Sequence, residues 1–103
     1  MSTSLLEEAL ETWGIGNAVM KTSEEVGELL MAMHHWYGEA STGKGTGEKG
    51  SDMDLAMEVA DVEIMMAQLR ILVGDALVTE LKIGKLQRLR KRLDNAKKTG
   101  CGR

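Results

Sequence analysis

Apolar side chains recur three and four residues apart along most of this chain, and no proline interrupts them. This spacing puts them on one face of an α-helix, whereas a half-buried β-strand would require strict alternation. Eight methionines and the absence of phenylalanine also favour helices over sheet, because methionine is a good helix former that packs adaptably. At 103 residues, the chain is expected to form one all-α domain with a thin core.

Glycines divide the helical pattern into four predicted helices. Their ranges are 4–13, 17–37, 52–73 and 75–98. Ser4 is the predicted N-cap of the first, with Glu7 in the capping-box position. The glycine-rich stretch 38–51 is expected to be a flexible loop, because its spacing does not match a Walker phosphate-binding loop. We therefore predict a four-helix-bundle-like domain over residues 1–98, followed by a flexible tail at 99–103.

The net charge of −3 is unevenly spread. Residues 82–103 hold nine of the 13 lysines and arginines and a single acid, Asp94. This basic end is expected to be a solvated helix face, while attraction of an anionic substrate is an alternative; the acidic remainder argues against nucleic-acid binding. The single cysteine, Cys101, cannot form an internal disulfide, which fits a reducing, cytoplasmic compartment. Neither a membrane span nor a signal peptide is expected.

Two of the predicted helices carry carboxylates three residues apart. Glu25 and Glu28 share a face of the second helix, and Glu58 and Asp61 share a face of the third. Both pairs lie at the rim of an apolar stripe, where acids lose hydration unless a cation pairs with them. The stripe of the third helix is predicted to consist of Leu55, Val59, Val62, Met66, Leu69 and Val73. If the helices pack antiparallel, the four carboxylates converge and repel one another. A divalent cation would relieve that repulsion, and oxygen-only ligands favour Mg²⁺ or Mn²⁺ over Zn²⁺.

These acids have two alternative interpretations besides a magnesium site: surface charges and ligands of a di-iron site. They are surface charges if the protein is a non-enzymatic helical interaction module. A carboxylate-bridged di-iron site is disfavoured, because such bundles place a histidine three residues after a glutamate, and Met31 and Asp61 occupy those positions. His34 and His35 are out of register and are expected to be ordinary polar residues, with a substrate contact as the alternative for one of them.

The order Glu24-Glu25-x-x-Glu28 followed by Glu58-x-x-Asp61 resembles the signature of the all-α nucleoside triphosphate pyrophosphohydrolases. The most similar members are the compact MazG-like proteins of phages and bacteria. The resemblance extends from about residue 10 to 93 and includes Trp13-Gly14 and Lys85-Leu86-Gln87-Arg88-Leu89. The chain departs from the family pattern in its long inter-motif spacing, which the glycine-rich stretch absorbs, and at Asn17, where relatives often have glutamine.

The resemblance implies an oligomeric enzyme of the all-α NTP pyrophosphatase type. It would use Mg²⁺, with Mn²⁺ as a substitute, to cleave the α–β phosphoanhydride of an NTP or dNTP into a monophosphate and pyrophosphate. The implied metal ligands are Glu25, Glu28, Glu58 and Asp61, and Glu24 would orient or deprotonate the attacking water. The implied substrate contacts are Lys85 and Arg88 for phosphate and Asn17 for the base. Trp13 or Trp36 would stack on the base, with a place in the core as the alternative for each. The resemblance also implies a homodimer or homotetramer in nucleotide metabolism, for example in house-cleaning of nucleotide pools.

Overall fold

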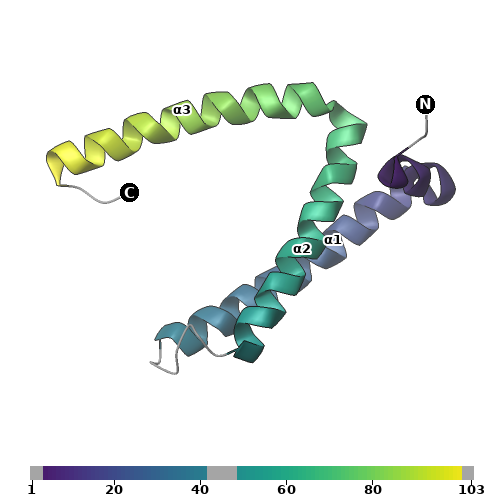
Figure 1. The fold of residues 1–103 in the computed structure, drawn as a ribbon, viewed down its shortest axis with the longest axis horizontal. Helices are drawn as coiled ribbons and strands as arrows, with labels where there is room; N and C mark the ends of the chain where they lie inside the picture. The colour runs from purple at the N-terminus through teal and green to yellow at the C-terminus, as the bar shows by residue number, and fades with distance from the viewer. Residues whose placement is uncertain (1–3, 42–48, 101–103) are drawn as a thin grey trace. The chain divides into compact units, whose positions relative to one another are not determined.

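The computed structural model describes the backbone of residues 4–41 and 49–100. Within these ranges it is helical, without strands, which confirms the all-α class. The helices are α1 (Leu5–Ser41), α2 (Lys49–Val73) and α3 (Asp75–Thr99), as labelled in Figure 1. The chain divides into two compact units, Met1–Ile71 and Leu72–Arg103. The first contains α1 and nearly all of α2, the second contains α3, and each unit is described by itself.

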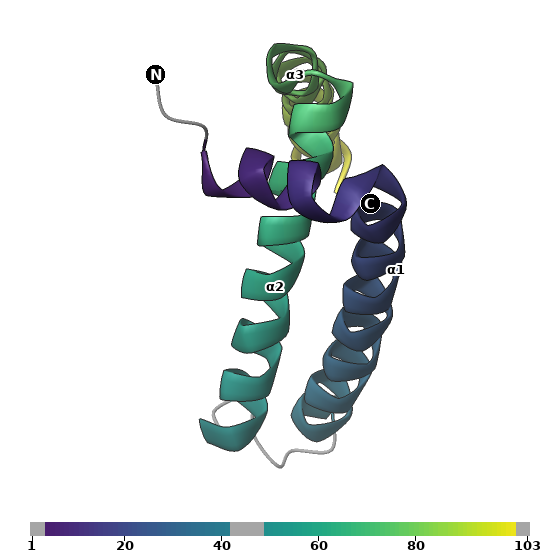
Figure 2. The same ribbon diagram turned by 90° about the vertical axis from the view of Figure 1, so that its right-hand side faces the viewer.

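The first two predicted helices are joined into one bent helix, so the described chain has three helices where four were predicted. Gly14 interrupts α1 with a φ of 85° and a ψ of 168°, and the segment before it runs in a different direction from the rest of α1 (Figure 2). Glycine adopts this positive φ without the steric cost that a side chain would add. The break predicted at this point is therefore confirmed, while Gly16 lies inside the helix.

The helix caps agree with the sequence at one end and correct it at another. The Ser4 Oγ accepts a hydrogen bond from the Glu7 backbone N–H at 3.1 Å, which confirms Ser4 as the N-cap of α1. At the start of α3 the N-cap is Gly74, with a φ of 110°, and Asp75 is the first helical residue rather than the cap. Asp75 still stabilises this end, because an acid in the first turn interacts favourably with the helix dipole.

The helices on either side of the glycine-rich stretch are longer than predicted. α1 continues to Ser41 and α2 begins at Lys49, so both extend into the range 38–51 that was expected to be a loop. Glycine weakens a helix by about 1 kcal/mol without forbidding it, so a glycine does not by itself fix a helix end. The centre of the predicted loop, residues 42–48, and the end of the predicted tail, residues 101–103, lie outside the described residues.

In the first unit, α2 runs antiparallel beside the part of α1 that follows Gly14 (Figures 1 and 2). Among the described side chains, Ala18 is the only buried apolar one, and it is joined by the polar Thr22 and Gln68. The Thr22 hydroxyl satisfies its hydrogen-bonding capacity locally by donating to the Ala18 carbonyl at 2.7 Å. The core is thin, as expected for a chain of this length.

The packed face of α2 is rotated slightly from the predicted stripe. The spacing predicted that Val59 and Met66 would pack inward, but both are exposed, at 41% and 38%. Glu58 and Met65 are half-buried in their place. Glu58 therefore lies in the packed face itself and not at its rim. The physical consequence is that an acid faces α1 while apolar side chains of α2 face outward.

Large apolar side chains are exposed on every described helix. Examples are Ile15 and Met31 on α1, at 63% and 74%, and Leu86 on α3, at 53%. α3 contains no buried residue at all. None of the helices within residues 4–41 and 49–100 is long and apolar enough to cross a membrane.

Candidate metal centre

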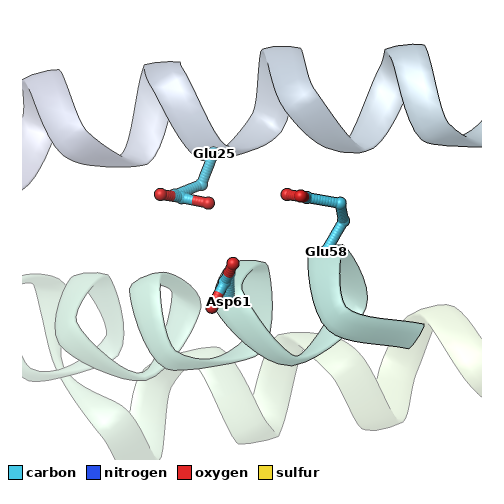
Figure 3. Close-up of side chains that lie close together, drawn as sticks. All are labelled: Glu25, Glu58 and Asp61. Carbon is cyan, nitrogen blue, oxygen red and sulfur yellow. The ribbon is translucent and has the colours of Figure 1, made fainter. Parts of the chain in front are cut away.

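Three carboxylates from two helices converge inside the α1–α2 unit. Glu25 of α1 points toward Glu58 and Asp61 of α2 (Figure 3). One carboxylate oxygen from each residue lies within 4.8 Å of those from the other two. The arrangement follows from helix geometry, because residues at i and i+3 share a face and antiparallel packing turns that face toward α1. Three of the four predicted metal ligands are thus brought together.

The fourth predicted ligand, Glu28, lies beside this carboxylate trio. Its side chain is exposed, and its negative charge is close enough to Glu25 and Glu58 to raise the pKa of each. The fourth predicted ligand is therefore a neighbour of the trio and not one of its members.

Two oxygens of the trio are buried without a partner. Glu25 and Glu58 are each half-buried, and the Oε2 atom of each is inaccessible to solvent and accepts no hydrogen bond. Buried polar atoms in proteins are nearly always paired, because leaving one unpaired forfeits the hydration that it had in the unfolded chain. These two oxygens are consequently unsatisfied by the described protein groups and are suited to a cation.

The same environment raises the pKa of two carboxyl groups. Loss of hydration is the main reason that the pKa of Glu25 lies above its ordinary value, and the negative charges of Glu28 and Asp61 raise it further. For Glu58 the causes have the same order, loss of hydration first, and Asp54 adds a smaller contribution. Each of these effects penalises the ionised form. A bound divalent cation would oppose all of them at once.

A pocket of about 320 Å³ adjoins the carboxylate trio, entirely within the first unit. α1 lines it with Trp13, Asn17, Lys21 and Glu25. α2 lines it with Asp61, Ile64, Met65 and Gln68. The two residues expected to contact the base, Trp13 and Asn17, thus share a pocket with two of the expected metal ligands. Trp13 is 67% exposed, so its ring is available at the pocket surface rather than used in the core.

A second hollow lies on the side of the acids nearer the end of α1. Its volume is about 380 Å³, and its polar lining residues are Glu28, His35, Asp54 and Glu58. The carboxylate cluster is therefore open to solvent on two sides, although two of its oxygens are covered. His35 is exposed, in keeping with its expected character as an ordinary polar residue.

Glu24 lies outside the trio. Its carboxylate pairs with the Lys21 ammonium group at 3.7 Å, and both side chains are more than half exposed. A surface ion pair of this kind contributes little to stability and breaks easily. The expected role of Glu24 toward the attacking water stays a prediction.

The expected phosphate contacts belong to the second unit. Lys85 and Arg88 are exposed on α3 and border a hollow of about 350 Å³ on that helix, together with Lys82 and Arg92. Four cations at this spacing form a continuous basic face, since residues three and four apart are neighbours on a helix. Their contact with phosphate stays a prediction.

Sequence reasoning missed two features of the first unit. Gln68 is buried beside the trio, although its position seven residues after Asp61, two turns along the same helix face, was visible in the sequence. The indole N–H of Trp36 donates a hydrogen bond to Asp52 Oδ1 at 2.8 Å, linking the two helices near the glycine-rich stretch. No local spacing signals that second contact, because the partners lie on different helices.

Comparison with known proteins gives no relative: no protein-family model, curated protein or solved structure matches the chain. The functional argument therefore depends on the residues and geometry described above.

Proposed function

We propose that this protein is a Mg²⁺-dependent nucleoside triphosphate pyrophosphohydrolase that converts an NTP or dNTP to the monophosphate and pyrophosphate. The observation that carries the proposal is the convergence of Glu25, Glu58 and Asp61 from two helices, with one oxygen of each within 4.8 Å of the others. The order of the acidic motifs, which resembles that of the all-α pyrophosphohydrolases, supplies the reaction type.

The donor set fits a hard divalent cation. All candidate ligands are carboxylate oxygens, and Mg²⁺ and Mn²⁺ prefer oxygen ligands. The unpartnered Oε2 atoms of Glu25 and Glu58 support the fit, because a cation would restore the interaction that burial removes. Glu28, whose charge raises the pKa of both Glu25 and Glu58, would be the fourth ligand.

A cation held by these residues would supply Lewis acidity toward the phosphate oxygens and would lower the pKa of a bound water. The protein's own residues would do the rest. Glu25, Glu58 and Asp61 would fix the position of the substrate phosphates through the cation. Glu24 would leave its exposed pairing with Lys21 and accept the proton of the attacking water. Water adds across the α–β phosphoanhydride, and pyrophosphate leaves with the electron pair of the broken P–O bond.

The remaining substrate contacts follow from charge and shape. Lys85 and Arg88 would neutralise phosphate oxygens, because negative charge spreads over these atoms in the transition state. Trp13 and Asn17 would contact the base in the pocket beside Glu25 and Asp61. An exposed indole provides a flat surface on which any base can stack.

We also propose that the protein assembles as a homodimer or homotetramer. Large exposed apolar side chains occur on all three described helices, while Ala18 is the one buried apolar residue among those described. Association between subunits would remove such side chains from water. Light scattering coupled to size-exclusion chromatography tests this directly, and a monomer at micromolar concentration would contradict it.

The direct test of the activity is pyrophosphate release from a panel of NTPs and dNTPs. Purified protein should release pyrophosphate from at least one of them with Mg²⁺ present, and the activity should disappear with excess chelator. Mn²⁺ should restore it. Folded protein, verified by its helical circular dichroism, that hydrolyses none of the panel would refute the proposal.

A non-enzymatic helical interaction module is the second candidate, and the exposed apolar side chains favour it. In that case the acids are ordinary surface charges and Mg²⁺ has no specific site. Calorimetric titration separates the two candidates. The enzyme proposal requires Mg²⁺ to bind and to stabilise the fold, by about 2.7 kcal/mol when its concentration is 100 times the dissociation constant. Absence of both binding and stabilisation would favour the module.

A further inference from the structure

The pocket beside the carboxylate trio changes character along its length. The acidic side chains of Glu25 and Asp61 and the primary amide of Gln68 all line it. Gln68 follows Asp61 by seven residues, which corresponds to a rise of about 10 Å along α2. The apolar side chains of Ile64 and Met65 lie between them in the sequence and in the pocket lining. Along α2, the pocket lining thus offers an acid, an apolar wall and an amide in that order.

Gln68 is the most buried polar residue described in the protein, with 7% of its surface exposed. Within the described residues, its amide takes part in no side-chain hydrogen bond. A primary amide has two N–H donors and a carbonyl acceptor. The inaccessible, unpaired side-chain atoms of the described residues are the Oε2 atoms of Glu25 and Glu58, and the amide atoms of Gln68 are not among them. The amide therefore still reaches the pocket that Gln68 lines, where it can pair with water or a ligand.

The order of groups in the pocket matches the order of groups in a nucleotide. Phosphates bound through the acidic end would leave the base beside Ile64 and Met65, with its polar edge toward Gln68. A glutamine amide pairs with an edge that presents a donor next to an acceptor, as nucleobases do. Trp13, which is exposed at the same pocket, offers the ring face for stacking.

We infer that Gln68 is the specificity-determining residue of this site, and that it hydrogen-bonds the edge of the nucleobase while the carboxylate trio engages the phosphates. The inference rests on the proposed function for the orientation of the nucleotide. Its test measures nucleotide binding and not hydrolysis, so a failure of this inference can be distinguished from a failure of the proposed function. Its ligand class is a nucleoside phosphate whose base presents adjacent donor and acceptor groups.

The test is calorimetric binding of nucleoside 5′-monophosphates and of ribose 5-phosphate, each with Mg²⁺ present. The wild type should bind at least one nucleoside monophosphate more tightly than ribose 5-phosphate, which lacks the base. Gln68→Met keeps the length and shape of the side chain and removes its hydrogen bonds. It should weaken that nucleotide about tenfold while changing the affinity for ribose 5-phosphate less than about twofold. Gln87→Met, at an exposed glutamine of α3, should change neither.

Three results would overturn the inference. They are equal binding of nucleotide and ribose 5-phosphate by the wild type, unchanged nucleotide binding by Gln68→Met, and equal weakening of both ligands by that variant. If Gln68→Met does not fold, Gln68→Ala provides the same comparison, because it also removes the amide and adds no charge that would act on the phosphate of either ligand. Base-dependent binding through Gln68 without any pyrophosphate release would support the inference and refute the proposed hydrolase.

Discussion

The α1–α2 unit contains two polar contacts between its helices that differ in one physical respect. Near the glycine-rich stretch, the Trp36 indole donates to Asp52 at 2.8 Å, so donor and acceptor satisfy each other. At the trio, Glu25, Glu58 and Asp61 offer only acceptors, and two of their oxygens are buried without a partner. The first contact stabilises the metal-free fold, whereas the second opposes it. A polar contact that opposes folding indicates a function outside the fold itself.

The largest effect is expected from Glu58→Gln. The substitution keeps the size of the side chain and removes the charge, so it should lower pyrophosphate release by about 100-fold or more, since a metal ligand is lost. Metal-free Glu58→Gln should be at least as stable as the wild type, because repulsion within the trio is relieved. Activity assays and urea unfolding measure the two quantities.

Glu63→Gln is the matched control for this variant. Glu63 lies on the same helix and is exposed, so its substitution should leave both activity and stability close to those of the wild type. Loss of stability in metal-free Glu58→Gln would contradict the view that this carboxylate opposes folding. Retained activity in the same variant would contradict its role as a metal ligand.

A smaller and opposite effect is expected at the other contact. Asp52→Ala removes the acceptor for the Trp36 indole and should lower the free energy of unfolding by about 1 kcal/mol, with or without Mg²⁺. A double-mutant cycle with Trp36→Phe, which removes only the donor, isolates the hydrogen bond from other changes. A coupling energy near zero would show that the hydrogen bond between Trp36 and Asp52 does not stabilise the α1–α2 unit.

The two contacts also differ in how far the sequence could predict them. The convergence of Glu25 with Glu58 and Asp61 followed from i, i+3 spacing and antiparallel packing, both of which are properties of helices. The hydrogen bond between Trp36 and Asp52 did not follow, because it depends on how far each helix extends toward the glycine-rich stretch. Sequence patterns fix helix ends poorly.

The face that α2 turns toward α1 was predicted with a small error for a related reason. Val59 and Met66 are as apolar as Val62 and Met65, so hydrophobic periodicity alone could not choose between the two overlapping stripes. The structure half-buries Glu58 and Met65 together with Val62, and it leaves Val59 and Met66 exposed. Burial of an acid in preference to a valine is unfavourable for an isolated chain and is consistent with ligand binding at the trio and subunit contacts on the outer face.

The smallest predicted effect is a pH dependence of stability that comes from Glu25 and Glu58. In the folded protein the pKa values of Glu25 and Glu58 lie above the ordinary 4.5. As the pH rises above 4.5, the unfolded chain loses these protons before the folded protein does. The folded state then binds more protons than the unfolded state, and stability falls with increasing pH until the raised pKa values are passed.

The direction of this pH dependence distinguishes the carboxylate trio from the Trp36–Asp52 hydrogen bond without any assay of activity. Urea unfolding in the presence of chelator, at several pH values from 4.5 upward, should give a declining stability for the wild type and a shallower decline for Glu58→Gln, which lacks one of the two groups. The free energy of unfolding of Asp52→Ala should decline with pH at the same slope as that of the wild type and should be lower at every pH. Mg²⁺ should reverse the trend, because it competes with protons for the same oxygens and binds more tightly as they are lost. A decline of equal slope in Glu58→Gln and the wild type would mean that the trio is not its source.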